Sequence, residues 1–150
     1  MWRRLRQLIN AAYEVFWPAH QKAAADYERR LPDVLFETLT IVEKTPSNRA
    51  VLPRQFIEVV YKSTPRWSMF CCPCGCGEVI SLPLETHHKP HWQVSQSSAG
   101  RPQLYPSVWR NKGCLSHFWI DDGRVFWCAD SGKSPSAVRP DLYMLRSNRN

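Results

Sequence analysis

The feature that most constrains the fold of this chain is a pair of short cysteine-containing segments. The first, C-P-C-G-C-G, spans residues 72–77, and the second, G-C-L-S-H, spans residues 113–117. Thiolates and an imidazole supplied by two loops are the ligands that a tetrahedral zinc ion or a small iron–sulfur centre requires. The sequence therefore predicts a fold in which these two segments meet at one metal site.

Five residues in these segments are candidate ligands: Cys72, Cys74, Cys76, Cys114 and His117. Three thiolates and one imidazole make an ordinary closed structural zinc site. The layout is also similar to that of Rieske proteins, in which two loops supply C-x-H and C-x2-H to an iron–sulfur cluster. Because a cysteine replaces the first of those histidines, zinc is preferred over a 3Cys–1His iron–sulfur cluster. The spacing leaves open which four of the five residues bind.

Other potential ligands have simpler explanations. Cys71 and Cys128 stand beside Phe70 and Trp127, and apolar neighbours predict packed thiols. A second metal site could be built from Glu85, His87, His88 and His91. Histidines in a loop or at a strand end are more often surface residues, so the second site is the weaker interpretation.

Composition and charge limit the classes of protein. A chain of 150 residues with 43% hydrophobic residues can bury a core without disulfides. The basic start is not followed by an unbroken apolar run, and no stretch approaches the ~20 apolar residues of a membrane span, which predicts a cytoplasmic protein. The net charge of +7 lies mostly in the two ends of the chain. Nucleic acid or an anionic membrane is therefore a weaker candidate partner than a protein.

The first 17 residues have a helical period that Pro18 breaks or kinks, and residues 19–30 are predicted as a second helical stretch that ends before Pro32. The apolar stripe includes Trp2, Leu5, Ile9 and Phe16. Such a stripe either packs on the protein's own core or docks a protein partner or a membrane surface. We name these four residues as candidate partner-binding positions.

From residue 35 the pattern changes to short β-rich runs, and Asp122-Gly123 is a strong hairpin signal. Strands are predicted over residues 35–42, 56–61, 67–71, 79–84, 92–94, 103–105, 108–109, 118–120 and 125–127. The predicted fold class is α+β: N-terminal helices followed by a small antiparallel β domain with two metal-binding loops, zinc-ribbon-like or Rieske-like. The expected organisation is a helical arm at 1–31, a β-rich zinc-binding domain at 32–130 and a basic tail at 131–150.

Four motifs in order carry a family resemblance: C-P-C-G-C-G-E at 72–78, L-Y-P-S-V-W at 104–109, G-C-L-S-H-F-W at 113–119 and V-F-W-C at 125–128. Over residues 60–130 the chain resembles an uncharacterised bacterial family of zinc-binding domains of unknown function. Some members of such families occur beside bacterial ubiquitin-like proteins and their activating and conjugating enzymes. The resemblance implies a zinc-binding role for the five candidate ligands and a place in protein modification.

Two function classes follow. The first is a zinc-binding adaptor that grips another protein, such as a ubiquitin-like modifier or its conjugating enzyme. The second is a metal- or thiol-dependent enzyme acting on protein conjugates, in which a free Cys74 or Cys76 could serve as an acceptor thiol. Glu78 is near the cluster, but the H-x-E or H-E-x2-H context of zinc hydrolases is absent. The sequence favours the adaptor and leaves open whether the chain is an enzyme; a Rieske-like iron–sulfur protein is a third hypothesis.

Overall fold

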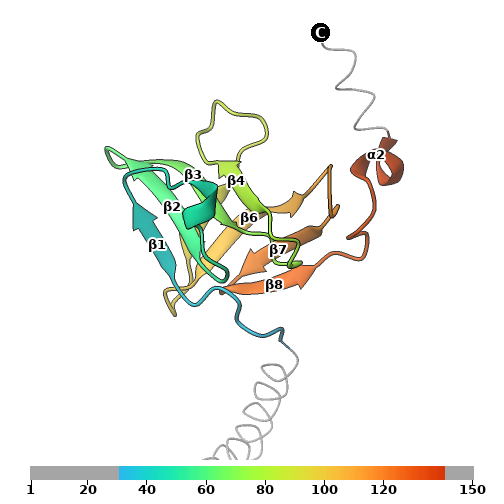
Figure 1. The fold of residues 1–150 in the computed structure, drawn as a ribbon, viewed down its shortest axis with the longest axis horizontal. Coiled ribbons are helices and arrows are strands. Elements are labelled where there is room, and N and C mark those ends of the chain that lie inside the picture. The colour runs from blue at the N-terminus through green and yellow to red at the C-terminus, as the bar shows by residue number, and fades with distance from the viewer. Residues whose placement is uncertain (1–30, 141–150) are drawn as a thin grey trace, which may run out of the picture. The chain divides into compact units, whose positions relative to one another are not determined.

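The computed structural model describes residues 31–140 of the chain (Figure 1). Of the described residues, those from 33 to 140 belong to one compact unit. The predicted helical arm, with its candidate partner-binding positions, lies outside the described residues except for residue 31, and the last ten residues of the predicted tail lie outside them too.

Eight strands of the described region form two four-stranded sheets. The first sheet, in spatial order, contains β1 (Leu39–Val42), β2 (Phe56–Tyr61), β3 (Thr64–Cys71) and β4 (Val79–Pro83). The second contains β5 (Gln93–Gln96), β6 (Pro102–Trp109), β7 (His117–Asp121) and β8 (Arg124–Trp127). All pairs are antiparallel except β1 with β2, which is parallel.

The predicted α+β class is wrong for the described region, which is almost entirely β. Its helices are a three-residue 3-10 turn, η1 (Asn48–Ala50), and a four-residue α-helix, α2 (Pro135–Val138). The β part is also larger than the single small antiparallel unit expected: two sheets share one core, and a second buried cluster includes Ile57, Val59 and Met69 of the first sheet. None of the helices in residues 31–140 has the length and apolarity needed to cross a membrane.

The main core lies between the two sheets, which Figure 1 shows side by side. Phe56 of β2 stacks on Phe70 of β3 with ring centroids 4.9 Å apart, and Phe36 meets both rings edge-on. Phe118 of β7 completes the group from the second sheet. Aliphatic residues of both sheets fill the remaining space: Ile80, Leu82, Leu104, Val108, Ile120 and Val125. Burial of each phenylalanine contributes about 1.5–3 kcal/mol.

The hairpin predicted at Asp122-Gly123 is confirmed: it joins β7 to β8, and its two residues have φ angles of 47° and 69°. Gly123 is required for a second reason. A Cβ atom at this position would lie 2.1 Å from the carbonyl oxygen of Phe36. The Gly123 carbonyl in turn accepts hydrogen bonds from the backbone N–H groups of Leu35 and Phe36, so the start of the β unit is tied to this hairpin.

An irregularity in β6 positions the site described below. Between Leu104 and Val108 the strand advances four residues while its partner β7 advances two, from Ile120 to Phe118. Residues 105–107 therefore form a bulge next to the end of the sheet where β7 begins. Bulges of this kind bend a strand and re-aim its side chains.

Candidate functional site

Four cysteines come together where the β3–β4 turn meets the β6–β7 loop: Cys72, Cys74, Cys76 and Cys114. Their sulfur atoms all lie within 4.8 Å of one another. The Cys72 Sγ lies 3.3 Å from the Cys74 Sγ and 3.8 Å from the Cys114 Sγ. Zn–S bonds of ~2.3 Å in a tetrahedron place sulfur atoms about 3.8 Å apart. The donor set and its spacing therefore fit a tetrahedral zinc ion.

The backbone of the β3–β4 turn wraps this cluster. Gly75 and Gly77 have φ angles of 81° and 80°, a left-handed conformation that glycine adopts without strain. The Cys72 N–H donates to the carbonyl of Glu78 at 2.8 Å, which closes the turn at the point where β3 ends and β4 begins. These contacts direct the cysteine side chains of the turn toward one region.

Polar groups around the cluster favour a thiolate at Cys114. Arg110 donates to the sulfurs of Cys76 at 3.6 Å and Cys114 at 3.5 Å, and its guanidinium also pairs with Glu78. Burial opposes ionisation of Cys114, but hydrogen bonds from Ser116 outweigh it and lower the pKa of this thiol to about 6.

The buried Cys72 behaves in the opposite way, because burial raises the pKa of its thiol to about 12. The four thiols of the cluster thus differ in how readily they ionise when no cation is bound. A divalent cation would hold all four as thiolates, since metal binding deprotonates its ligands.

His117, the fifth predicted ligand, does not join the four cysteines. In an extended chain, adjacent side chains point to opposite sides. Ser116 faces the cluster, with its hydroxyl 3.1 Å from the Cys114 sulfur, while His117 opens β7 and faces away from it. Its imidazole instead lies between a serine and a carboxylate.

The two nitrogens of His117 contact Ser107 and Asp130. The Ser107 Oγ lies 3.2 Å from Nε2, and an Asp130 carboxylate oxygen lies 2.5 Å from Nδ1. A carboxylate can only accept, so Nδ1 carries the proton and Nε2 accepts from the Ser107 hydroxyl. This order of nucleophile, base and orienting acid is the arrangement of a serine hydrolase triad, which is recognised by geometry rather than by sequence position.

Each member of the triad has a defined structural support. Ser107 sits in the β6 bulge, His117 pairs with Trp109 across β6 and β7, and Asp130 follows β8. The Trp109 ring stacks on the imidazole with centroids 4.2 Å apart and planes 2° apart. The His117 backbone N–H donates to the Ser131 hydroxyl at 3.0 Å. The imidazole is therefore held in one orientation from three directions.

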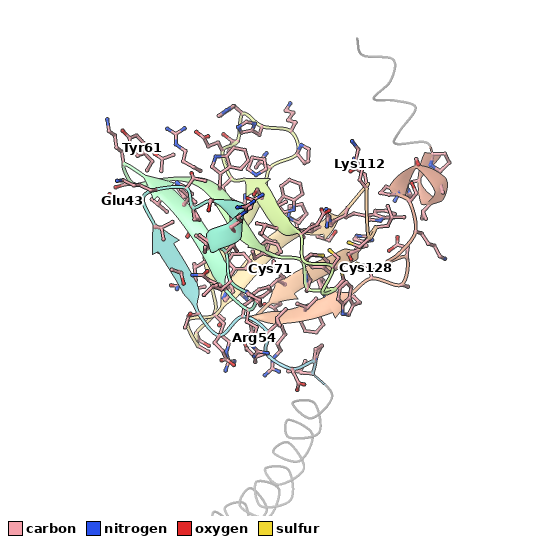
Figure 2. The ribbon with its side chains drawn as sticks, viewed as in Figure 1. Glu43, Arg54, Tyr61, Cys71, Lys112 and Cys128 are labelled. Atoms are coloured by element: carbon pink, nitrogen blue, oxygen red, sulfur yellow. The ribbon has the colours of Figure 1, made fainter. Side chains whose placement is uncertain are left out.

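Cys128 lies beside this triad, directly after β8 of the second sheet, whereas Cys71 ends β3 of the first sheet; both are labelled in Figure 2. Burial, followed by the negative charge of Asp130, raises the pKa of the Cys128 thiol. A thiol that stays protonated at neutral pH is a poor nucleophile. Ser107, which hydrogen-bonds to Nε2, is therefore the better candidate nucleophile. Cys71 donates instead to the Val51 carbonyl.

Three of the four residues of the second predicted metal site lie close together. Glu85, His87 and His88 have ligand atoms within 4.8 Å of one another in the β4–β5 loop. The Glu85 carboxylate is already bound by Arg66 at 2.5 Å, which competes with a cation. His91 is not part of this group; its Nδ1 lies 3.1 Å from the carbonyl oxygen of His88.

Sequence analysis missed Ser107 and Asp130 as functional residues. They lie ten residues before and 13 residues after His117, on separate elements, and neither is in a local signature such as G-x-S-x-G. The available signal was the L-Y-P-S-V-W motif around Ser107, which carried the family resemblance without indicating a role for the serine.

The fold and the site thus define a β protein that places a serine–histidine–aspartate triad beside a four-thiol cluster. The profile of a family described as "Bacterial ubiquitination-like system serine protease (BubE)" matches residues 41–128, which is more than half of the chain. The chain belongs to this family. The matched range contains the four clustered cysteines, Ser107 and His117, and ends two residues before Asp130.

The family description confirms the predicted association with a bacterial ubiquitin-like system. No curated protein and no solved structure matches the chain.

Proposed function

We propose that this chain is a serine protease that hydrolyses amide bonds made by a ubiquitin-like modifier. The observation that carries the proposal is the pair of contacts at His117, 3.2 Å from Nε2 to the Ser107 hydroxyl and 2.5 Å from Nδ1 to Asp130. The family description supports the same chemistry and the same pathway.

In the proposed reaction, Ser107 Oγ attacks the carbonyl carbon of the amide while His117 Nε2 takes the hydroxyl proton. The C–N bond then breaks, and His117 returns the proton to the leaving amine. Water next attacks the acyl-serine ester, again with His117 as base, and releases the carboxyl product and free Ser107. Asp130 keeps the proton on Nδ1 and stabilises the imidazolium that forms in both steps.

The four-thiol cluster would hold one zinc ion in this proposal. A site with four protein ligands is closed to substrate and has a structural role. Zinc would hold Cys114, which stands three residues before His117 in the chain. It would thereby fix the loop that leads into β7 and the position of His117, the proposed base, at the start of that strand. Zinc rather than iron is proposed because a closed four-thiolate tetrahedron is the commonest structural zinc site.

The substrates proposed from the family description are protein conjugates of a ubiquitin-like modifier. A cytoplasmic location stays a prediction from the sequence. The adaptor hypothesis makes a different prediction, because an adaptor binds its partner without needing Ser107. Docking through Trp2, Leu5, Ile9 and Phe16 stays a prediction, since these residues lie outside the described range.

Cleavage of a fusion between the ubiquitin-like modifier of the same system and a reporter protein tests the proposal. We expect the wild-type chain to release the reporter and Ser107→Ala to lose this activity while keeping its fold and zinc content. Ser95→Ala is the matched control, because Ser95 is an exposed serine on the neighbouring strand β5. Unchanged cleavage by Ser107→Ala would contradict the triad. Absence of cleavage by wild type, together with capture of the modifier, would favour the adaptor.

A further inference from the structure

Three potential metal ligands of different chemistry meet at the triad. Ligand atoms of His117, Cys128 and Asp130 all lie within 4.8 Å of one another, and none of them belongs to the four-thiol cluster. They offer one imidazole nitrogen, one sulfur and one carboxylate oxygen. Zinc accepts all three of these ligand types.

The backbone holds this group together independently of any metal. The Cys128 N–H donates to the His117 carbonyl at 3.0 Å, which extends the β7–β8 ladder by one bond. The Ser131 N–H donates to the Cys128 carbonyl at 3.0 Å, and the Ser131 hydroxyl accepts from the His117 N–H. This turn keeps Cys128 and Asp130 on the same side of β7 as the imidazole.

We propose that His117, Cys128 and Asp130 form a second zinc site, and that zinc bound there inhibits the protease. The inhibitory effect rests on the proposed function, whereas the metal binding does not. On binding, the Cys128 thiol loses its proton to the buffer and its sulfur becomes a ligand, together with one nitrogen of His117 and one oxygen of Asp130.

Zinc in this position and a working triad exclude each other. Coordination through Nε2 would remove the lone pair that accepts the Ser107 proton. Coordination through Nδ1 would separate Asp130 from the ring and displace the proton that Asp130 holds there. Either way His117 can no longer act as a general base, because Nε2 is then either bound to the metal or, when the metal holds Nδ1, carries the single proton of the neutral ring and can only donate.

The two sites should fill at different zinc concentrations. The four-thiol cluster offers a complete tetrahedron, whereas the triad site offers three protein ligands and leaves one position for water. The triad site is also accessible from solvent, since the side chains of His117 and Asp130 are 14% and 29% exposed. Limiting zinc therefore fills the structural cluster, and excess zinc binds reversibly at the triad and reduces activity.

A cobalt titration of the zinc-loaded protein tests the site directly. Cobalt(II) binds more weakly than zinc to a given donor set, so it leaves the four-thiol cluster occupied by zinc. A thiolate bound to cobalt absorbs in the near ultraviolet. We expect one equivalent of cobalt to produce this band in the wild type and in Cys71→Ala, the control for a half-buried thiol elsewhere, but not in Cys128→Ala.

The same three proteins are then compared in the cleavage assay with added zinc. Cys128→Ala should keep its activity without added zinc, and the zinc concentration for half inhibition should rise at least about tenfold, as for other losses around a metal site. An unchanged cobalt band or unchanged zinc inhibition in Cys128→Ala would overturn the proposal. If the wild type cleaves nothing, the proposed function fails, and the cobalt band alone still decides whether the second site exists.

Discussion

The four-thiol cluster and the triad lie next to each other but are built differently. Three of the four thiols come from one glycine-containing turn, where Cys72 packs in the core and Arg110 and Ser116 donate hydrogen bonds to sulfur atoms. The triad is held by the second sheet, with Ser107 on β6 and His117 on β7. The cluster is thus built mainly within one turn and one loop, whereas the triad depends on strand pairing. In the proposed function, the cluster supports the loop before β7 and the triad performs the chemistry.

Asp130→Asn should have the largest effect on the triad while leaving the four-thiol cluster unchanged. An amide at this position favours the wrong tautomer of His117, and kcat is expected to fall by about 10⁴-fold. At one equivalent of zinc, which fills the four-thiol cluster first, the zinc content measured by elemental analysis should stay at the wild-type level. Asp121→Asn is the control, because Asp121 is exposed and accepts from the Gln103 side chain at 2.6 Å. Loss of zinc in Asp130→Asn would show that the two regions are not separate.

Cys72→Ser should disrupt the four-thiol cluster first and the triad only as a consequence. Cys72 is the buried thiol of the cluster, and losing it should release zinc and lower the free energy of unfolding by more than about 4 kcal/mol. Activity should fall with zinc content, because the loop that leads into His117 loses its support. Cys71→Ser, one residue away and hydrogen-bonded to Val51, should cost about 1 kcal/mol in a denaturant titration. Wild-type zinc binding by Cys72→Ser would contradict the proposed ligand set.

Trp109→Leu should impair the triad moderately while leaving the cluster intact. The indole lies flat on the imidazole, where it orients the ring and stabilises its protonated form. We expect kcat/KM to fall about tenfold, or about 1.4 kcal/mol, with unchanged zinc content. Trp109→Phe keeps an aromatic face and should recover most of the loss. Equal activity of the leucine and phenylalanine variants would show that stacking is not what matters.

Asp122→Asn should have the smallest effect, on the hairpin that follows His117. The Ser97 hydroxyl donates to the Asp122 carboxylate at 2.6 Å, and the Arg101 guanidinium donates to it at 3.0 Å. Both contacts lower the pKa of this carboxyl. A lowered pKa stabilises the fold at pH values above the usual Asp range, and this contribution disappears as the pH falls through the lowered value. The variant should be less stable by under about 1 kcal/mol at pH 7, and in urea titrations this difference should shrink as the pH is lowered toward 2. An equal difference at both pH values would contradict this.

Much of the β architecture could be predicted because it depends on local patterns. Alternating apolar residues located most strands, and Asp122-Gly123 identified the β7–β8 hairpin. Strand pairing is not local, so neither the parallel β1–β2 pair nor the division into two sheets was foreseen. The helical prediction concerned residues outside the described range, and its extension to the class of the whole fold was the error.

For the site as well, the part that depends on local spacing could be predicted and the part that depends on strand pairing could not. Closely spaced cysteines in a glycine-containing turn indicated the cluster, because short spacing alone brings thiols together. His117 was assigned to that cluster from its C-x2-H spacing, but its place at the start of a strand turns it away from the side that Ser116 faces. Ser107 and Asp130 meet His117 only through sheet pairing and the β6 bulge, which no local pattern shows.

Labelling with a fluorophosphonate tests the central claim most directly. Such a probe forms a covalent bond with a serine hydroxyl that a neighbouring base activates. Peptide mass spectrometry should find one adduct, on Ser107, and the adduct should be lost in His117→Ala and kept in Cys128→Ala. Absence of an adduct on Ser107 in the zinc-loaded protein, or undiminished labelling of His117→Ala, would contradict the triad.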